Sequence, residues 1–120
     1  MTKVQVMMTA SILPPIHPGE ILREEYLAPL GLKPYTLAKK LHVPRTRIER
    51  LVAEETPVTP DTALRLAKFF GSTPQFWLNM QASYDVAVLE KEMAVLLDEI
   101  EELKVENHIH EDRTKIRKIA

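Results

Sequence analysis

Apolar residues recur at helical spacing along most of the chain, and a proline stands at or just before the start of each such stretch. These prolines are Pro18, Pro34, Pro44, Pro60 and Pro74. Proline is favoured in the first turn of a helix, where its missing N–H group is not needed. No stretch between them alternates in the manner of a half-buried strand. The pattern therefore predicts an all-α domain of five helices.

Residues 35–51 predict two short helices joined by a tight turn. The apolar positions that give each helix one buried face are Leu37, Ala38, Leu41, Ile48 and Leu51. His42 and Val43 occupy the turn, where a positive φ is often needed and histidine is tolerated better than most residues. The second helix then presents Arg45, Thr46, Arg47, Glu49 and Arg50 outward. A buried back with an Arg/Thr-rich front suits a helix that reads the DNA major groove, so the pattern predicts a helix-turn-helix.

The flanking helices also have one apolar face each. Leu22, Tyr26 and Leu30 form that face in the first helix, and Gly31 is expected to end it. His17 precedes Pro18 and is expected to cap this helix. In the fifth helix the bulky residues are Phe76, Trp77, Met80 and Tyr84. We interpret them as core, with the lining of a ligand pocket as the alternative.

After Tyr84 the apolar spacing changes to alternating steps of three and four residues. The residues of this seam are Val86, Leu89, Met93, Leu96, Ile100 and Leu103. Such spacing is typical of the a and d positions of a coiled coil, and it predicts a long, acidic C-terminal helix. Two interpretations stay open: the seam packs back on its own domain, or it packs against a partner helix from a second copy or another protein.

The chain then divides into four predicted parts. Residues 1–15 form a flexible N-terminal arm, and residues 16–85 form the DNA-binding domain. Residues 86–106 form the C-terminal helix for a dimer or partner contact. Residues 107–120 mix both charges and are expected to be disordered.

Charge limits how the chain can bind nucleic acid. The net charge is −1, so such binding must rest on local charge. The basic residues of the motif are Lys33, Lys39, Lys40, Arg45, Arg47 and Arg50, against Glu49 alone. The residues expected at base edges are Arg45, Thr46 and Arg47, followed by Glu49 and Arg50, and those expected at phosphates are Tyr35, Thr36 and Lys39. The alternative is that these charges only solvate a helix face.

Enzymatic, metal-binding and membrane roles find little support. The chain has no cysteine, which excludes disulfides and thiol nucleophiles and suits a reducing cytoplasm. Its apolar runs are too short to span a membrane, so we expect a cytoplasmic protein. His108 and His110 are spaced for a metal but have no suitable partner at standard spacing. Phosphate-loop and hydrolase motifs are absent. We therefore expect a protein that is not an enzyme and has no metal or cofactor.

Four segments together resemble a known family. They are His17-Pro-Gly-Glu-Ile-Leu22, the helix-turn-helix, Val58-Thr-Pro-Asp-Thr-Ala-Leu-Arg-Leu-Ala67 and Thr73-Pro-Gln-Phe-Trp-Leu-Asn-Met-Gln81. In this order they are similar to the HigA/VapI-type antitoxins of the XRE, or lambda-repressor-like, helix-turn-helix proteins, over about residues 16–92. The resemblance implies an all-α, lambda-repressor-like DNA-binding domain that dimerises on a palindromic operator. It also implies a type II toxin–antitoxin system in which the protein represses its own operon and neutralises a HigB-like mRNA endonuclease.

Two departures from the family pattern affect this expectation. His42 stands where the family usually has glycine in the turn. After the reading helix, Glu54 and Glu55 replace a more basic stretch and would repel phosphates if they faced the DNA backbone. Two alternatives follow: a solitary transcriptional regulator without a toxin, or a protein-interaction module whose DNA binding has decayed.

Overall fold

The computed structural model describes residues 14–105, and every regular element in that range is helical. The predicted all-α fold is therefore confirmed. The predicted N-terminal arm, apart from its last two residues, lies outside the described residues, as does the predicted tail over residues 107–120.

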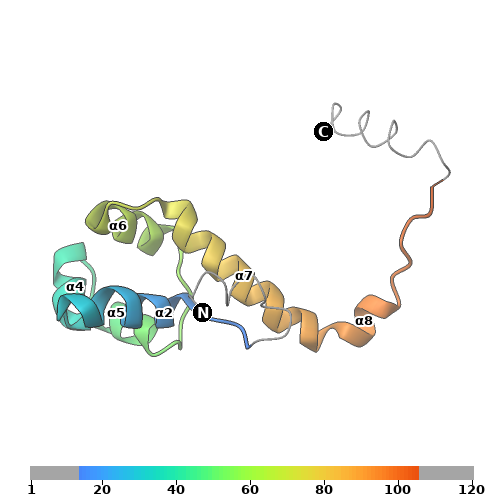
Figure 1. Cartoon of the computed structure of the whole chain (residues 1–120), viewed down its shortest axis with the longest axis horizontal. Coiled ribbons are helices and arrows are strands. Elements are labelled where there is room, and N and C mark those ends of the chain that lie inside the picture. Colours follow the sequence, from blue (N-terminus) through green and yellow to red (C-terminus); the bar gives the residue numbers. More distant parts are fainter. Residues whose placement is uncertain (1–13, 106–120) are drawn as a thin grey trace.

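The helices form a body with one projecting arm (Figure 1). In chain order they are α2 (Pro18–Ile21), η2 (Leu22–Leu27), α3 (Ala28–Leu30), α4 (Pro34–Leu41), α5 (Arg45–Val52), α6 (Pro60–Phe70), α7 (Pro74–Glu92) and α8 (Ala94–Asp98). The first three follow one another without a break, so the segments α2 to α7 make the five predicted helices. Figure 1 shows α7 running away from the body, with α8 at its far end.

The predicted proline starts are confirmed. Four helices carry proline in their first turn, and Pro44 is the N-cap of α5. Thr59 and Thr73 complete their helix starts, because each side chain accepts a backbone N–H at 3.3 and 3.2 Å, respectively. At the opposite ends, Gly31 and Gly71 take the left-handed conformation that stops α3 and α6. Local sequence therefore sets most of the helix boundaries.

The first helix departs from regular α geometry in its middle. The segment η2 is a six-residue π-helix, and the Ala28 N–H bonds the carbonyl of Arg23, five residues earlier. Pro29 has no N–H to offer the preceding turn, which favours such a widened turn. The widening places Leu22 and Leu27 in the core, whereas Leu30 is 65% exposed. The prediction that Leu30 shares the buried face is therefore wrong.

The core lies between the helix-turn-helix and the N-terminal half of α7. Trp77 is fully buried, and its indole N–H donates to the Ser72 hydroxyl at 3.1 Å. Its ring lies 5.2 Å from that of Tyr26. Met80 is also buried and Tyr84 is half-buried, but Phe76 is 40% exposed. The core interpretation of the bulky residues in α7 is thus correct for Trp77 and Met80 and wrong for Phe76.

One side chain of α7 holds the loop that follows α5. Gln81 is buried, and its Oε1 accepts the Val58 N–H at 2.7 Å. Its amide nitrogen donates to Asp85 at 2.9 Å. A buried amide with both ends bonded fixes a loop that would otherwise leave a backbone donor unpaired. The loop between α5 and α6 is therefore anchored on α7.

Backbone meets backbone where α2 crosses the end of α5. A Cβ built on Gly19 would lie 1.9 Å from the Leu51 carbonyl oxygen and 2.9 Å from its carbon. Neither atom belongs to a flexible side chain that can move aside. Glycine at this position therefore sets how closely the first helix approaches α5, the predicted reading helix.

The predicted continuous helix over residues 86–106 is wrong. The helix α7 ends at Glu92, Met93 is non-helical with φ −98° and ψ 6°, and α8 ends at Asp98. Glu90 and Glu92 lie at the negative end of α7, where acidic groups are unfavourable. Further on, Asp98 and Glu102 are spaced so that a continued helix would bring like charges together. The seam residues are consequently spread over two helices and the non-helical residues 99–105.

The seam also lacks cover among the residues that the structure describes. Five of its six side chains are exposed and Met93 is half-buried; Val86 is 61% exposed and Ile100 is 70% exposed. The interpretation in which the seam packs back on its own domain is therefore wrong for this structure of the protomer. The partner interpretation stays a prediction.

Replacing Gly19 with alanine is expected to destabilise the protein. Helix propensity alone predicts the opposite, because alanine in a helix is favoured over glycine by about 1 kcal/mol. The contact with the Leu51 carbonyl forces α2 away from α5, and overpacking of this kind costs roughly 1–3 kcal/mol. Urea unfolding monitored by circular dichroism measures the difference. A Gly19→Ala protein as stable as the wild type would contradict the described contact.

Protonation of His17 is expected to destabilise the fold at low pH. The His17 ring is buried against Tyr84 at 4.8 Å, and its Nδ1 accepts the Gly19 N–H at 2.9 Å. Burial lowers the pKa of His17 below its ordinary value of 6.5, although Glu54 and Asp85 oppose the shift. Below pH 6.5 the unfolded chain therefore binds more protons than the folded one, and stability falls as the pH drops towards the folded pKa.

The measurement is the urea midpoint at pH 7.5 and 5.5, with His17→Asn as the matched control. Asparagine can still cap the helix but does not titrate in this range. The wild-type midpoint should fall more between the two pH values than that of the control. Equal falls in both proteins would show that His17 contributes nothing to the pH dependence.

Candidate nucleic-acid interface

The helices α4 and α5 meet through a left-handed turn. His42 has φ 59° and ψ 46°, so the predicted positive φ at this position is confirmed. The Val43 N–H reaches back to the Ala38 carbonyl at 3.0 Å, which closes the end of α4. Ala38 is buried on α4, and Ile48 and Leu51 are buried on α5. The buried back and the turn of the predicted helix-turn-helix are therefore both present.

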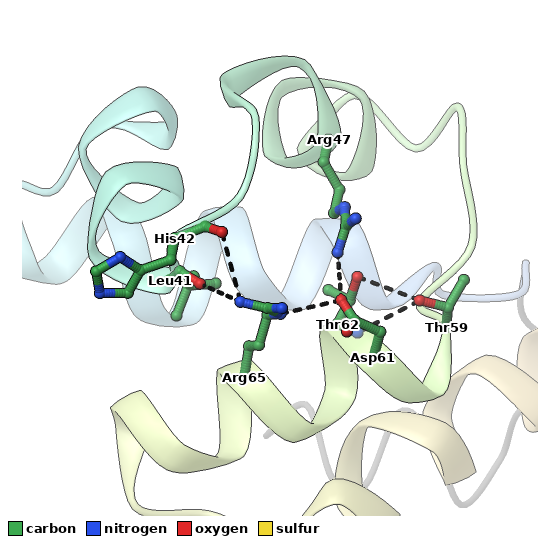
Figure 2. A network of polar contacts seen from close by, with 7 residues as sticks. All are labelled: Leu41, His42, Arg47, Thr59, Asp61, Thr62 and Arg65. Atoms are coloured by element: carbon green, nitrogen blue, oxygen red, sulfur yellow. Dashed lines mark hydrogen bonds and ion pairs between the residues drawn. The ribbon is translucent and has the colours of Figure 1, made fainter.

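An arginine from α6 holds this turn from the side (Figure 2). One terminal nitrogen of Arg65 donates to the Leu41 carbonyl at 2.8 Å and to the His42 carbonyl at 3.4 Å. These carbonyls end α4 and lack partners within the helix, so a cation there is favourable. The Nε of Arg65 donates to Asp61 at 3.0 Å, which fixes the arginine from its other side. The turn is thus tied to the first turns of α6.

The front of α5 is open to solvent, as predicted. Arg45, Thr46, Arg47 and Arg50 are exposed, and Glu49 is half-exposed. The Arg45 guanidinium pairs with Glu49 at 2.9 and 3.1 Å. Its carbon also lies 5.6 Å from the centre of the Tyr35 ring, within the range of a cation–π contact. The first arginine of the reading helix therefore has a defined position over α4.

Arg47 has a different orientation from that expected of a base-reading side chain. Figure 2 shows it reaching from α5 towards α6, where its guanidinium donates to Asp61. The same carboxylate oxygen accepts from Arg65. Hydrogen bonds from Arg65 and then Arg47 lower the pKa of Asp61 below its ordinary value. The carboxylate therefore stays charged and joins the reading helix to α6.

The predicted phosphate contacts lie on α4. Tyr35 is 48% exposed, Thr36 is half-buried and Lys39 is exposed. The structure brings Tyr35 into contact with Arg45 of α5. Whether any of the three contacts phosphate stays a prediction.

One of the two acidic residues after α5 is neutralised by a neighbouring helix. Glu54 takes a positive φ of 64°, and its carboxylate pairs with Arg23 of η2 at 3.2 Å. A second nitrogen of Arg23 donates to the Val52 carbonyl at the end of α5. Arg23 thus holds both the end of the reading helix and the acidic loop. Glu55 is exposed, and its N–H closes the turn by bonding the Arg50 carbonyl at 2.9 Å.

Sequence reasoning missed three residues that position the interface: Arg23, Asp61 and Arg65. Asp61 and Arg65 are four residues apart, a spacing that predicts an ion pair on a helix. No local signal links this pair to the turn or to Arg47. Arg23 lies 31 residues from Glu54, and a contact over that distance has no periodic signature.

Within residues 14–105, none of the helices combines the length and apolar character needed to cross a bilayer. The same range holds no cluster of three or more His, Cys, Asp or Glu side chains arranged around a metal position. The predicted pair His108 and His110 lies outside it.

Comparisons with known proteins agree with this geometry. Residues 22–77 match the family described as helix-turn-helix. Virulence-associated protein I of Dichelobacter nodosus is 55% identical over 80 residues, which cover 67% of this chain and 74% of that protein.

Solved structures give the same result over a longer stretch. The Pseudomonas aeruginosa antitoxin HigA with the higBA promoter has a TM-score of 0.73 and 37% identity, covering 75% of this chain and 99% of that one. An addiction module antidote protein of a HigA family from Coxiella burnetii has a TM-score of 0.72 and 42% identity, covering 76% and 100%. The shared region therefore spans about three quarters of this chain.

Proposed function

The chain belongs to the XRE-type helix-turn-helix family that includes the HigA antitoxins, and we propose that it is a sequence-specific DNA-binding antitoxin that represses its own operon. The observation that carries the proposal is α5, a helix with a buried back and an open front of basic and hydroxyl side chains. The turn before it and the loop after it are both held by arginines, so the front is presented in one orientation.

The proposed interface uses two kinds of contact. Lys39 and the Tyr35 hydroxyl on α4 suit the DNA backbone, where contacts fix position without reading sequence. Arg45 and Thr46 open α5 and suit base edges in the major groove, with Glu49 and Arg50 one turn further along. A bidentate arginine–guanine contact discriminates by about 1–3 kcal/mol. Arg45 is the strongest base reader in this scheme, because Tyr35 holds its side chain at the start of α5 and a base edge can replace its partner Glu49.

The acidic loop supports DNA binding over the alternative in which that function has decayed. Glu54 is paired with Arg23, and Arg23 also donates to the Val52 carbonyl at the end of α5. Its charge is therefore partly balanced before any phosphate approaches. Glu55 remains exposed and reduces phosphate attraction locally. This opposition from Glu55 is modest beside the lysines and arginines of α4 and α5.

We also propose that the protein is a homodimer held by the C-terminal arm, residues 86–105. The exposed residues of the seam are distributed along α7, α8 and the residues that follow α8. Several large apolar side chains exposed in one region are typical of a partner surface. A palindromic operator requires two reading helices about 34 Å apart, and a two-fold dimer supplies them.

Membership of the HigA-containing family supports a further part of the function, the neutralisation of a HigB-like mRNA endonuclease. The alternative of a solitary regulator differs in genetic context. A small basic protein encoded immediately upstream favours the antitoxin, whereas an isolated gene favours the regulator.

Replacing Arg45 with alanine is expected to weaken the sequence preference. Loss of one bidentate base contact lowers operator affinity by about 1–3 kcal/mol, with a smaller effect on scrambled DNA. Fluorescence anisotropy with the DNA upstream of the gene and with a scrambled duplex measures both affinities. Lys91→Ala is the matched control, because Lys91 is exposed on α7 and carries the same charge. Unchanged preference in Arg45→Ala would remove Arg45 from the interface.

The arm is tested by the double variant Leu89→Gln/Leu96→Gln. Both side chains are exposed in the protomer, so the helical fold should survive while the dimer dissociates. Light scattering after size-exclusion chromatography gives the mass, and circular dichroism checks the fold. Leu64→Gln is the control, since Leu64 is 59% exposed but lies on α6. A double variant that stays dimeric at the wild-type concentration would place the dimer contact elsewhere.

A further inference from the structure

A single carboxylate, that of Asp61, sits between two arginines at the edge of the reading helix (Figure 2). Its Oδ2 accepts hydrogen bonds from Arg47 of α5 and from Arg65 of α6. Asp61 and Arg47 are both open to solvent, with side-chain exposures of 52% and 41%. DNA that reaches α5 therefore also comes within reach of this pair.

The two arginines differ in their freedom to leave the carboxylate. Arg65 is held at its other end by the carbonyls of Leu41 and His42, so it keeps its place whether or not DNA is present. Arg47 has no second partner in the part of the chain that the structure describes. An arginine binds a phosphate with the same paired geometry that it uses for a carboxylate. Asp61 and a DNA phosphate therefore compete for Arg47.

We propose that Asp61 is a specificity-determining residue that keeps Arg47 off the DNA backbone and uses it to hold α5 against α6. This inference rests on the proposed DNA-binding function and deepens it. In this arrangement Arg47 positions the reading helix and does not make the base contact that the sequence predicts. Base reading is left to the rest of the α5 front.

The competition affects the two classes of DNA differently. Binding to arbitrary DNA comes mainly from phosphate contacts, so each arginine withheld from phosphate weakens it. Binding to an operator also depends on base contacts, which need α5 in a fixed orientation. The Arg47–Asp61 pair thus lowers non-specific affinity while it preserves the orientation that the operator requires. Both effects raise the ratio of operator affinity to non-specific affinity.

The test compares Asp61→Asn with Asp98→Asn in the full chain. Asp98 is exposed at the end of α8, so the control makes the same change in net charge away from the reading helix. Dissociation constants are measured by fluorescence anisotropy for the upstream DNA and for a scrambled duplex at several salt concentrations. Circular dichroism confirms that each variant is folded.

Asp61→Asn is expected to bind scrambled DNA roughly two- to fivefold more tightly, since exposed ion pairs are worth little more than this. The slope of log affinity against log salt should steepen by about 0.9, the value for one added phosphate contact. Operator affinity should rise less, so the ratio of operator to scrambled affinity falls. Asp98→Asn should leave the slope and the ratio unchanged.

The same substitution in an Arg47→Ala background distinguishes two effects of Asp61 on DNA binding. Asp61 can act by holding Arg47, or it can act by repelling DNA phosphates directly. In Arg47→Ala, the Asp61→Asn change should alter scrambled-DNA affinity no more than Asp98→Asn does. An equal gain with and without Arg47 would overturn the proposal, as would an unchanged salt slope in Asp61→Asn alone.

The wild-type protein separates this proposal from the proposed function. Operator preference in the wild type with no effect of Asp61→Asn overturns the role of Asp61 alone. No operator preference in the wild type overturns the proposed function, while the scrambled duplex still tests the competition for Arg47. Absence of binding by every protein overturns both.

Discussion

The close approach of two backbones, at Gly19 and Leu51, is the constraint on which the rest of the structure depends. It places the first helix directly on the C-terminal end of the reading helix, with no side chain between them. Because α2 and η2 are continuous, the same approach brings Arg23 to the Val52 carbonyl and to Glu54. The orientation of α5 and the pairing of Glu54 in the loop after it thus share one cause.

Helix positions followed from the sequence because their signals are local. The proline starts, the glycine ends and the left-handed turn at His42 each depend on a few adjacent residues. Local signals were misleading where the first helix departs from regular α-helical geometry. The π-helical turn moved Leu27 into the core and Leu30 out of it, and a regular 3.6-residue period cannot show such a shift. The predicted continuous helix over residues 86–106 is interrupted at Met93. No other part of the described chain buries the apolar seam that would stabilise such a helix.

The candidate interface likewise has one part that the sequence predicts and another that it does not. The open front of α5 was visible in the sequence, since it is what an apolar back leaves outward. The residues that orient it were not, because Arg23, Asp61 and Arg65 act on positions 14 to 31 residues away. Arg47 illustrates the consequence: its place on the helix was predicted correctly, but its direction depends on a carboxylate in another helix. Periodicity assigns a face to a side chain and says nothing about its partner.

The charge balance of the interface explains how a nearly neutral protein can still read DNA. Arg45 is paired with Glu49, and Arg47 with Asp61, so much of the positive charge near α5 is already balanced. Such a surface attracts arbitrary phosphates weakly. While Arg47 stays on Asp61, affinity for an operator must come from the rest of the α5 front, where a base edge can replace Glu49 as the partner of Arg45. This replacement depends on geometry, because the base edge must lie where the Glu49 carboxylate lay. A paired interface therefore favours the sequence that fits over the many that merely carry charge.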